Sequence, residues 1–171
     1  MQILVIVLRL FHVISAVLWF GGLTMLVMFI APAIDASGPI GQQFMQQLMR
    51  HTKVAVFMPV VGLLTVLSGI GLYWHNASVS AGAFGRSAPG MTYGVGGLAG
   101  IIALVVGIVM IGRSVGEMGR IGAAIAKSGG PPSSDQTQRM ATLRARMASG
   151  NKITWGLLLV AVTAMAVARY L

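Results

Sequence analysis

Histidines are the side chains of this sequence best suited to chemistry, because the chain has no cysteine and few acidic residues. Its 171 residues include 12 Lys or Arg, 3 Asp or Glu and 3 His. The lack of cysteine excludes disulfides, thiolate metal sites and iron–sulfur clusters. The sequence also contains no Ser–His–Asp set, no HExxH motif and no acidic cluster for a hard metal. It therefore offers little for hydrolytic chemistry.

Two of the histidines could hold a cofactor together. His12 lies one turn inside the first apolar segment, and His75 closes the second. At about 1.5 Å per residue, we expect their depths to differ by only a few ångströms. Two imidazoles on neighbouring helices can hold a b-type haem, and Arg9 on the same side would pair with a propionate. The alternative is an interhelical hydrogen bond for His12 and an interfacial position for His75.

Methionine is the second residue type that could bind a ligand, since thioethers suit Cu(I). The chain has 12 methionines, and Met25 and Met28 lie one turn apart in the first apolar segment. Methionine is also a flexible filler of hydrophobic cores. The sequence leaves a copper site and simple packing open as alternatives for these two residues.

Apolar segments long enough to cross a membrane must position these side chains. The chain is 56% apolar and 9% charged, whereas a soluble domain has roughly a quarter of its residues charged. A spanning helix needs about 20 apolar residues, and four segments qualify: 10–33, 54–74, 91–112 and 153–170. Because no alternating pattern is present, the sequence predicts an all-α membrane protein, with residues 1–171 forming a single domain built on a bundle of four transmembrane helices.

Basic residues predict the orientation of this bundle, because Lys and Arg are enriched in cytoplasmic loops. With four spans, nine of the 12 basic residues fall in the segments 34–53 and 113–152, and three fall on the side of the termini. Both termini are therefore expected to be periplasmic. The positive charge is expected to set membrane orientation and to meet lipids, and no nucleic-acid partner is expected.

The long inner loop, residues 113–152, carries a helical pattern of its own. Apolar residues recur at helical spacing on both sides of a Gly–Pro break at Ser128–Ser134. The sequence thus predicts a cytoplasmic amphipathic hairpin. It could bind anionic lipid or a partner, or its arms could be extensions of helices three and four that pack together, which we favour.

The third apolar segment contains many glycines. Gly96, Gly97, Gly100 and Gly107 lie within a few turns of one another. Small residues let helices approach closely in lipid, where apolar packing has no hydrophobic drive. These four glycines are expected to pack helix three in the centre of the bundle or against another subunit.

Several segments resemble a family of small polytopic bacterial membrane proteins. The stretch 8–22 (LRLFHVISAVLWFGG) is similar to the first span of the copper-resistance protein D-like group and its uncharacterised relatives. The stretches 65–73 (TVLSGIGLY) and 165–170 (MAVARY) resemble later parts of the same group. The resemblance implies a multi-pass protein of the bacterial inner membrane, with His12 the position most relevant to a metal or haem. It carries over no catalytic set, because further histidines are missing from the spans.

The absence of Asp, Glu and Lys from all four spans disfavours an ion-coupled transporter. The sequence therefore predicts a non-catalytic protein, an accessory or stabilising subunit of a larger membrane complex such as an electron-transfer assembly. Its partners would be membrane lipids and either partner subunits or further copies of the chain. Two alternatives remain: a haem b redox protein that uses His12, His75 and Arg9, and a copper-handling protein that uses Met25 and Met28.

Overall fold

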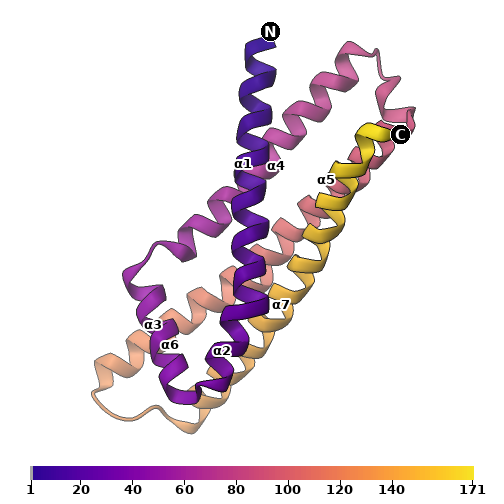
Figure 1. Ribbon diagram of the computed structural model, residues 1–171. Helices are drawn as coiled ribbons and strands as arrows, with labels where there is room; N and C mark the ends of the chain where they lie inside the picture. Colours follow the sequence, from indigo (N-terminus) through magenta and orange to yellow (C-terminus); the bar gives the residue numbers. More distant parts are fainter. Residues whose placement is uncertain (1) are drawn as a thin grey trace.

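Long helices make up the protein. The computed structural model describes residues 2–171, and within them the chain is helical with no strand (Figure 1). Four helical rods are long and apolar enough to cross a membrane: Gln2–Ala36, Val54–Val79, Ala88–Ser128 and Ser134–Tyr170. The predicted all-helical class is confirmed, and each of the four predicted segments lies within one of these rods. Both termini lie at one end of the bundle, at the top of Figure 1.

The first rod is longer than the predicted span 10–33. It consists of α1 (Gln2–Met25), a π-helical stretch (Leu26–Ile30) and α2 (Ala31–Ala36). The helix starts early because the first nine residues contain neither Gly nor Pro and only one charge. Pro32 lies in the first turn of α2. A proline has no amide hydrogen to donate, and its ring crowds the carbonyl four residues earlier. The wider π-helical turns directly before Pro32 relieve this crowding.

The segment after the first rod folds as a helix, where the sequence reading had only a loop. This helix, α3, covers Gly38–His51 and begins with a glycine of positive φ (55°) followed by Pro39. Proline is favoured in the first turn of a helix. Ile40, Phe44 and Leu48 recur every four residues, which is the signal that could have identified α3.

The middle of the chain forms two long helices. α4 (Val54–Val79) contains Pro59 near its start, and a short 3₁₀ turn (Phe84–Arg86) follows it. α5 (Ala88–Val106) is capped by the Ser87 side chain, which accepts from the Gly90 amide. It continues through a π-helical stretch (Gly107–Gly112) into α6 (Arg113–Ser128).

The last helix, α7 (Ser134–Val167), starts at a complete capping box formed by Ser133 and Gln136, and a 3₁₀ turn (Ala168–Tyr170) follows it. Gly129, with φ of 67°, ends α6 in the left-handed conformation. The break predicted at 128–134 is confirmed. The two arms of the hairpin are continuous with the third and fourth spans and pack on each other, as the favoured alternative predicted.

The helices associate in two pairs. α1 packs against α4, and α5 packs against α7, with fewer contacts between the pairs. In Figure 1, α5 and α7 run side by side over most of their length. The pairs meet at a small core formed by Trp19, Leu23, Val61, Ala103 and Leu158. The Trp155 indole nitrogen also donates to Thr24 Oγ1 at 3.1 Å, which connects α7 to α1.

Candidate functional site: a polar interface between α1 and α4

α1 and α4 run antiparallel, with large side chains of one helix lying against glycines of the other. A Cβ added to Gly62 would lie 3.0 Å from the Trp19 indole, and one added to Gly69 would lie 2.8 Å from the His12 ring. Closer to the termini, Leu8 lies against Gly71. These contacts place His12 level with the Thr65–Gly69 turn of α4.

The His12 imidazole makes a hydrogen bond between the two helices. Its Nδ1 lies 2.8 Å from the carbonyl oxygen of Thr65 and 3.4 Å from Ser68 Oγ. A carbonyl oxygen only accepts, so the neutral ring must carry its proton on Nδ1. In this tautomer the Nε2 atom has a free lone pair, as in a histidine that binds a metal through Nε2.

Three hydroxyl groups surround this bond, and each has a partner of its own. Ser15 donates to the Phe11 carbonyl and Ser68 to the Leu64 carbonyl. Thr65 Oγ1 lies 2.9 Å from Ser15 Oγ and 2.8 Å from its own helix's carbonyl at Val61. Ser15 and Ser68 are buried, at 4% and 6% exposed. The cluster of His12, Ser15, Thr65 and Ser68, called here the polar interface, therefore has the chemistry of a hydrogen-bonded interhelical contact.

His75 lies apart from the polar interface. It lines a surface hollow with Gln2, Val5 and Ile6 at the beginning of α1. His75 is seven positions after Ser68 on α4, so the two histidines lie about 10 Å apart along the helix axis. The two histidines are therefore further apart along the helices than the few ångströms expected, because antiparallel pairing places His75 opposite the first turns of α1.

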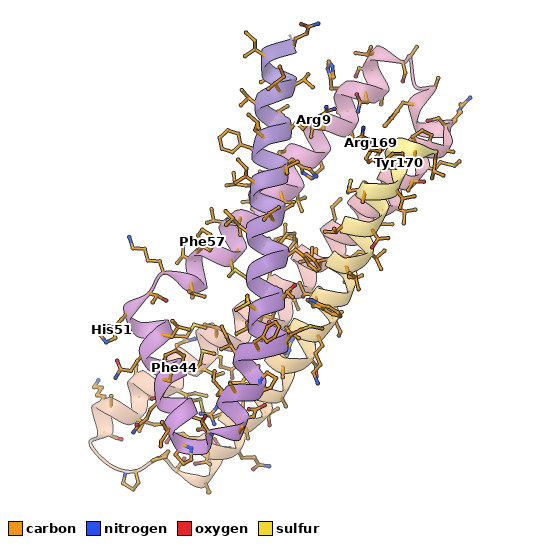
Figure 2. The ribbon with its side chains drawn as sticks, viewed as in Figure 1. Arg9, Phe44, His51, Phe57, Arg169 and Tyr170 are labelled. Atoms are coloured by element: carbon orange, nitrogen blue, oxygen red, sulfur yellow. The ribbon has the colours of Figure 1, made fainter. Side chains whose placement is uncertain are left out.

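The two imidazoles do not fit a haem held between them. The His12 ring is in close contact with the α4 backbone at Gly69, which leaves no room for a macrocycle between the helices. Arg9 is exposed near the same end of the bundle as Arg169 and Tyr170 (Figure 2). Haem binding by these residues stays a prediction, which an oxidised and a dithionite-reduced absorption spectrum would test.

Met25 and Met28 lie on the outside of the first rod. Their side chains are 53% and 49% exposed, so they do not point into a closed ligand cavity. In the part of the chain that the structure describes, no three His, Cys, Asp or Glu side chains come together to hold a metal ion. A copper site at these methionines stays a prediction without a converging set of donors.

Of the four glycines expected to pack the third span, one packs within the chain and three do not. A Cβ on Gly96 would lie 3.1 Å from Ala164 Cβ and 3.2 Å from the Ala161 carbonyl oxygen. A Cβ on Gly97, Gly100 or Gly107 would meet no heavy atom within 4 Å. Close packing within the chain is therefore seen at Gly96 alone, because a Cβ on any of the other three glycines would meet open space.

Sequence reading missed a second close contact, in the middle of α7. A Cβ on Gly150 would lie 2.9 Å from Met110 Cβ, so α7 packs closely against the π-helical stretch here. Thr154, one turn further, is 2% exposed. The small residues Gly150 and Thr154 are four positions apart, which is the packing signal that could have identified this contact.

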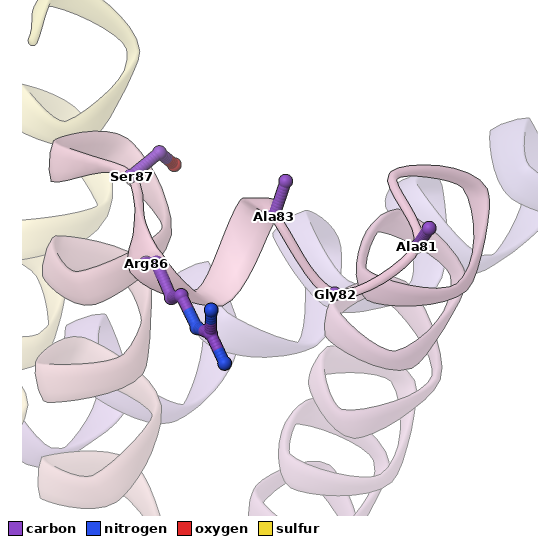
Figure 3. Close-up of a pocket in the computed structure, with 5 residues that line it drawn as sticks. All are labelled: Ala81, Gly82, Ala83, Arg86 and Ser87. Carbon is purple, nitrogen blue, oxygen red and sulfur yellow. The ribbon is translucent and has the colours of Figure 1, made fainter.

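A hollow at the turn between α4 and α5 offers little to a ligand. It is lined by Ala81, Gly82, Ala83, Arg86 and Ser87 (Figure 3). The backbone N–H groups of all five residues already donate hydrogen bonds to nearby carbonyls, for example Gly82 N to the Ala77 carbonyl oxygen at 2.8 Å. The Arg86 guanidinium is then the one charged donor that the hollow presents.

The end of the bundle away from the termini carries the ionic contacts. Arg139 Nε lies 2.8 Å from Glu117 Oε1 and connects α7 to α6. The hydrogen bond from Arg139, aided by its charge, lowers the pKa of the Glu117 carboxyl. Arg144 Nη1 donates to Gln42 Oε1 at 3.2 Å and connects α7 to α3.

Comparison with protein-family models, with curated proteins and with solved structures found no match. The resemblance to the copper-resistance protein D-like group therefore rests on the three sequence segments that carry it. The fold and its contacts define a multi-pass helical membrane protein, and its function has to be argued from the site.

Proposed function

We propose that the protein is a non-catalytic accessory subunit that packs against a partner helix in a membrane assembly, such as an electron-transfer complex. The open face of α5 carries this proposal. A Cβ added to Gly97 or Gly100 would have no neighbouring atom within 4 Å. The nearby side chains of Leu98, Ile101 and Val105 are exposed. Glycines that expose backbone in lipid are characteristic of positions where another helix approaches.

The polar interface supports the same proposal. His12, Thr65 and the two serines satisfy one another and their own helix carbonyls, so they fix α1 against α4. A proton carrier would need an acidic or basic partner along a path. A packing function therefore accounts for each of these polar groups.

The location we propose is the bacterial inner membrane, with both termini periplasmic. The nine-to-three division of basic residues supports this orientation. A reporter fused after Leu171 should be active outside the cytoplasm, and one inserted near Pro132 should be active inside it. The opposite pattern would overturn the orientation and leave the fold untouched.

Purification in mild detergent tests the accessory function. The wild-type chain should run in native gels with partner chains or as an oligomer. Gly97→Leu with Gly100→Leu should release it as a monomer that keeps its thermal stability. Gly119→Leu is a matched control, because Gly119 is also open but lies on α6. A wild-type chain that is a lone monomer, without co-purifying chains, would contradict the proposal.

A further inference from the structure

One side of the hairpin formed by α6 and the first half of α7 carries four arginines and a single carboxylate. Arg139 Nε lies 2.8 Å from Glu117 Oε1. The pKa of Glu117 is lowered first by this hydrogen bond and further by the charges of Arg120 and Arg146, so these two arginines also lie near the carboxylate. Arg113 is four residues before Glu117 and therefore on the same side of α6. This surface, called here the arginine side, has four positive charges and one negative charge.

Arg146 reaches from α7 to the π-helical stretch of the third rod. Its Nη2 donates to the Val109 carbonyl oxygen at 3.4 Å. The Arg113 N–H donates to the Ile108 carbonyl, five residues back, and α-helical spacing resumes at Arg113. This change of spacing skips the Val109 carbonyl, which is then free to accept from a side chain. Arg146 is exposed, so its remaining N–H groups can donate to a further acceptor.

The Arg146 guanidinium lies where the apolar part of the bundle begins. The close approach of Gly150 to Met110 places Lys152 about level with Val109. Lys152 is the last residue before the apolar part of α7. Because the hydrocarbon core of a bilayer ends where the apolar part of a spanning helix ends, the Val109 carbonyl and the guanidinium bound to it lie close to the phosphate layer.

Exposed apolar side chains continue from this level along the span. Ile153 is seven residues after Arg146, hence on the same side of α7, and is 47% exposed. Val160 is a further seven residues along and is 50% exposed. Ile108, next to Val109 on the third rod, is also about half exposed. Acyl chains would therefore find an apolar surface directly beyond the arginine side.

The chemistry of this position fits a phosphate ester. A guanidinium binds phosphate oxygens through parallel N–H donors, and Arg113, four residues after Val109, directly follows the third apolar segment. The carboxylate of Glu117 is already paired with Arg139. We propose that Arg146 and Arg113 bind the phosphate of an anionic phospholipid in the leaflet at this end, with its acyl chains along Ile153.

Native mass spectrometry of the full chain tests this site. The protein would be released from nanodiscs that contain equal amounts of phosphatidylglycerol and phosphatidylcholine, and the wild type should retain phosphatidylglycerol preferentially. Arg113→Gln with Arg146→Gln should reduce this preference about fivefold. Arg144→Gln with Lys152→Gln is the matched control, because it removes the same charge from the same end. Arg144 lies on the side of α7 that contacts α3, so the control should keep the preference.

An unchanged preference in the first variant would overturn the proposal. An equal loss in the control would also overturn it, because the charge of the whole end would then account for the binding.

The melting temperature gives a second readout that does not depend on the release of lipid. Phosphatidylglycerol should raise the melting temperature of the wild type above its value in phosphatidylcholine, and the Arg113→Gln, Arg146→Gln variant should lose this increase. An equal increase caused by inorganic phosphate in phosphatidylcholine nanodiscs would identify a free anion as the ligand and overturn the lipid assignment. Both readouts use the isolated chain, so failure of the accessory function would not affect them.

Discussion

The two helix pairs are held together by different means. Between α1 and α4, the glycines Gly62 and Gly69 lie against the rings of Trp19 and His12, and polar groups bridge the helices. Between the third span and α7, Gly96 of α5 lies against Ala164 Cβ and the Ala161 carbonyl, and Gly150 of α7 lies against Met110 in the π-helical stretch. A ring can turn aside for an added methyl group, whereas a Cβ moves only with its helix. The first pair is therefore specific but adaptable, and the second is rigid.

The largest effect is expected where α7 approaches the π-helical stretch. Gly150→Ala places a methyl group 2.9 Å from Met110 Cβ and 3.2 Å from Ile111 Cγ1, so the helix axes must separate. We expect a loss of about 1–3 kcal/mol in the free energy of unfolding, measured by steric trapping in bicelles. Gly156→Ala on the same helix, where the space is open, is the control and should not destabilise the protein.

A smaller effect is expected in the polar interface. Gly69→Ala pushes the His12 ring from the Thr65 carbonyl, and such interhelical hydrogen bonds are worth about 0.6 kcal/mol, with a maximum of about 1.7. The nearest atoms to the added methyl group all belong to His12. In a His12→Ala background, the cost of Gly69→Ala should therefore vanish. A cost that persists in the double variant would show that the adaptable character assigned to this pair is wrong.

The open glycines should behave in the opposite way. Gly97→Ala meets no neighbour within 4 Å, so the isolated chain should gain up to about 1 kcal/mol from helix propensity alone. Gly96→Ala, one residue away, should destabilise it, since its methyl group would meet Ala164 Cβ at 3.1 Å. Equal effects of the two substitutions in thermal melts would contradict the orientation of α5 described above.

The smallest effect concerns the ion pair at the basic end. The pKa of Glu117 is lowered in the folded chain by its hydrogen bond with Arg139. The pair therefore stabilises the hairpin above the ordinary carboxyl pKa, and this contribution disappears as the pH falls through the lowered value. Because both groups are exposed, the change is small. Melting curves from pH 7 to pH 3 should differ slightly between wild type and Glu117→Gln at pH 7 and converge at the acid end.

Much of the local structure could be predicted from the sequence. The four apolar segments, the Gly–Pro break at 128–134 and the continuity of the hairpin arms all follow from composition and helical spacing. The composition of α3 does not indicate a spanning helix, because its four Gln residues make the segment polar. Its apolar residues at every fourth position contained the information.

The candidate site was less predictable, as the histidines show. His12 and His75 both belong to the end of the bundle near the termini, as expected, but their relation depends on how α1 is offset against α4. That offset is set by the fit of Trp19, His12 and Met58 to glycines on the partner helix. Helical spacing within one segment carries no information about such an offset.

The sequence by itself determined where the chain is helical and which lengths can cross a membrane, since backbone hydrogen bonding and hydropathy are local properties. The tertiary structure decided that Gly96 and Gly150 pack while Gly97 and Gly100 stay open, and that His12 meets Thr65 and not His75. The physical reason is that lipid and protein interior are equally apolar. Hydrophobicity therefore does not show which face of a spanning helix turns inward, and only the fit between neighbouring helices fixes it.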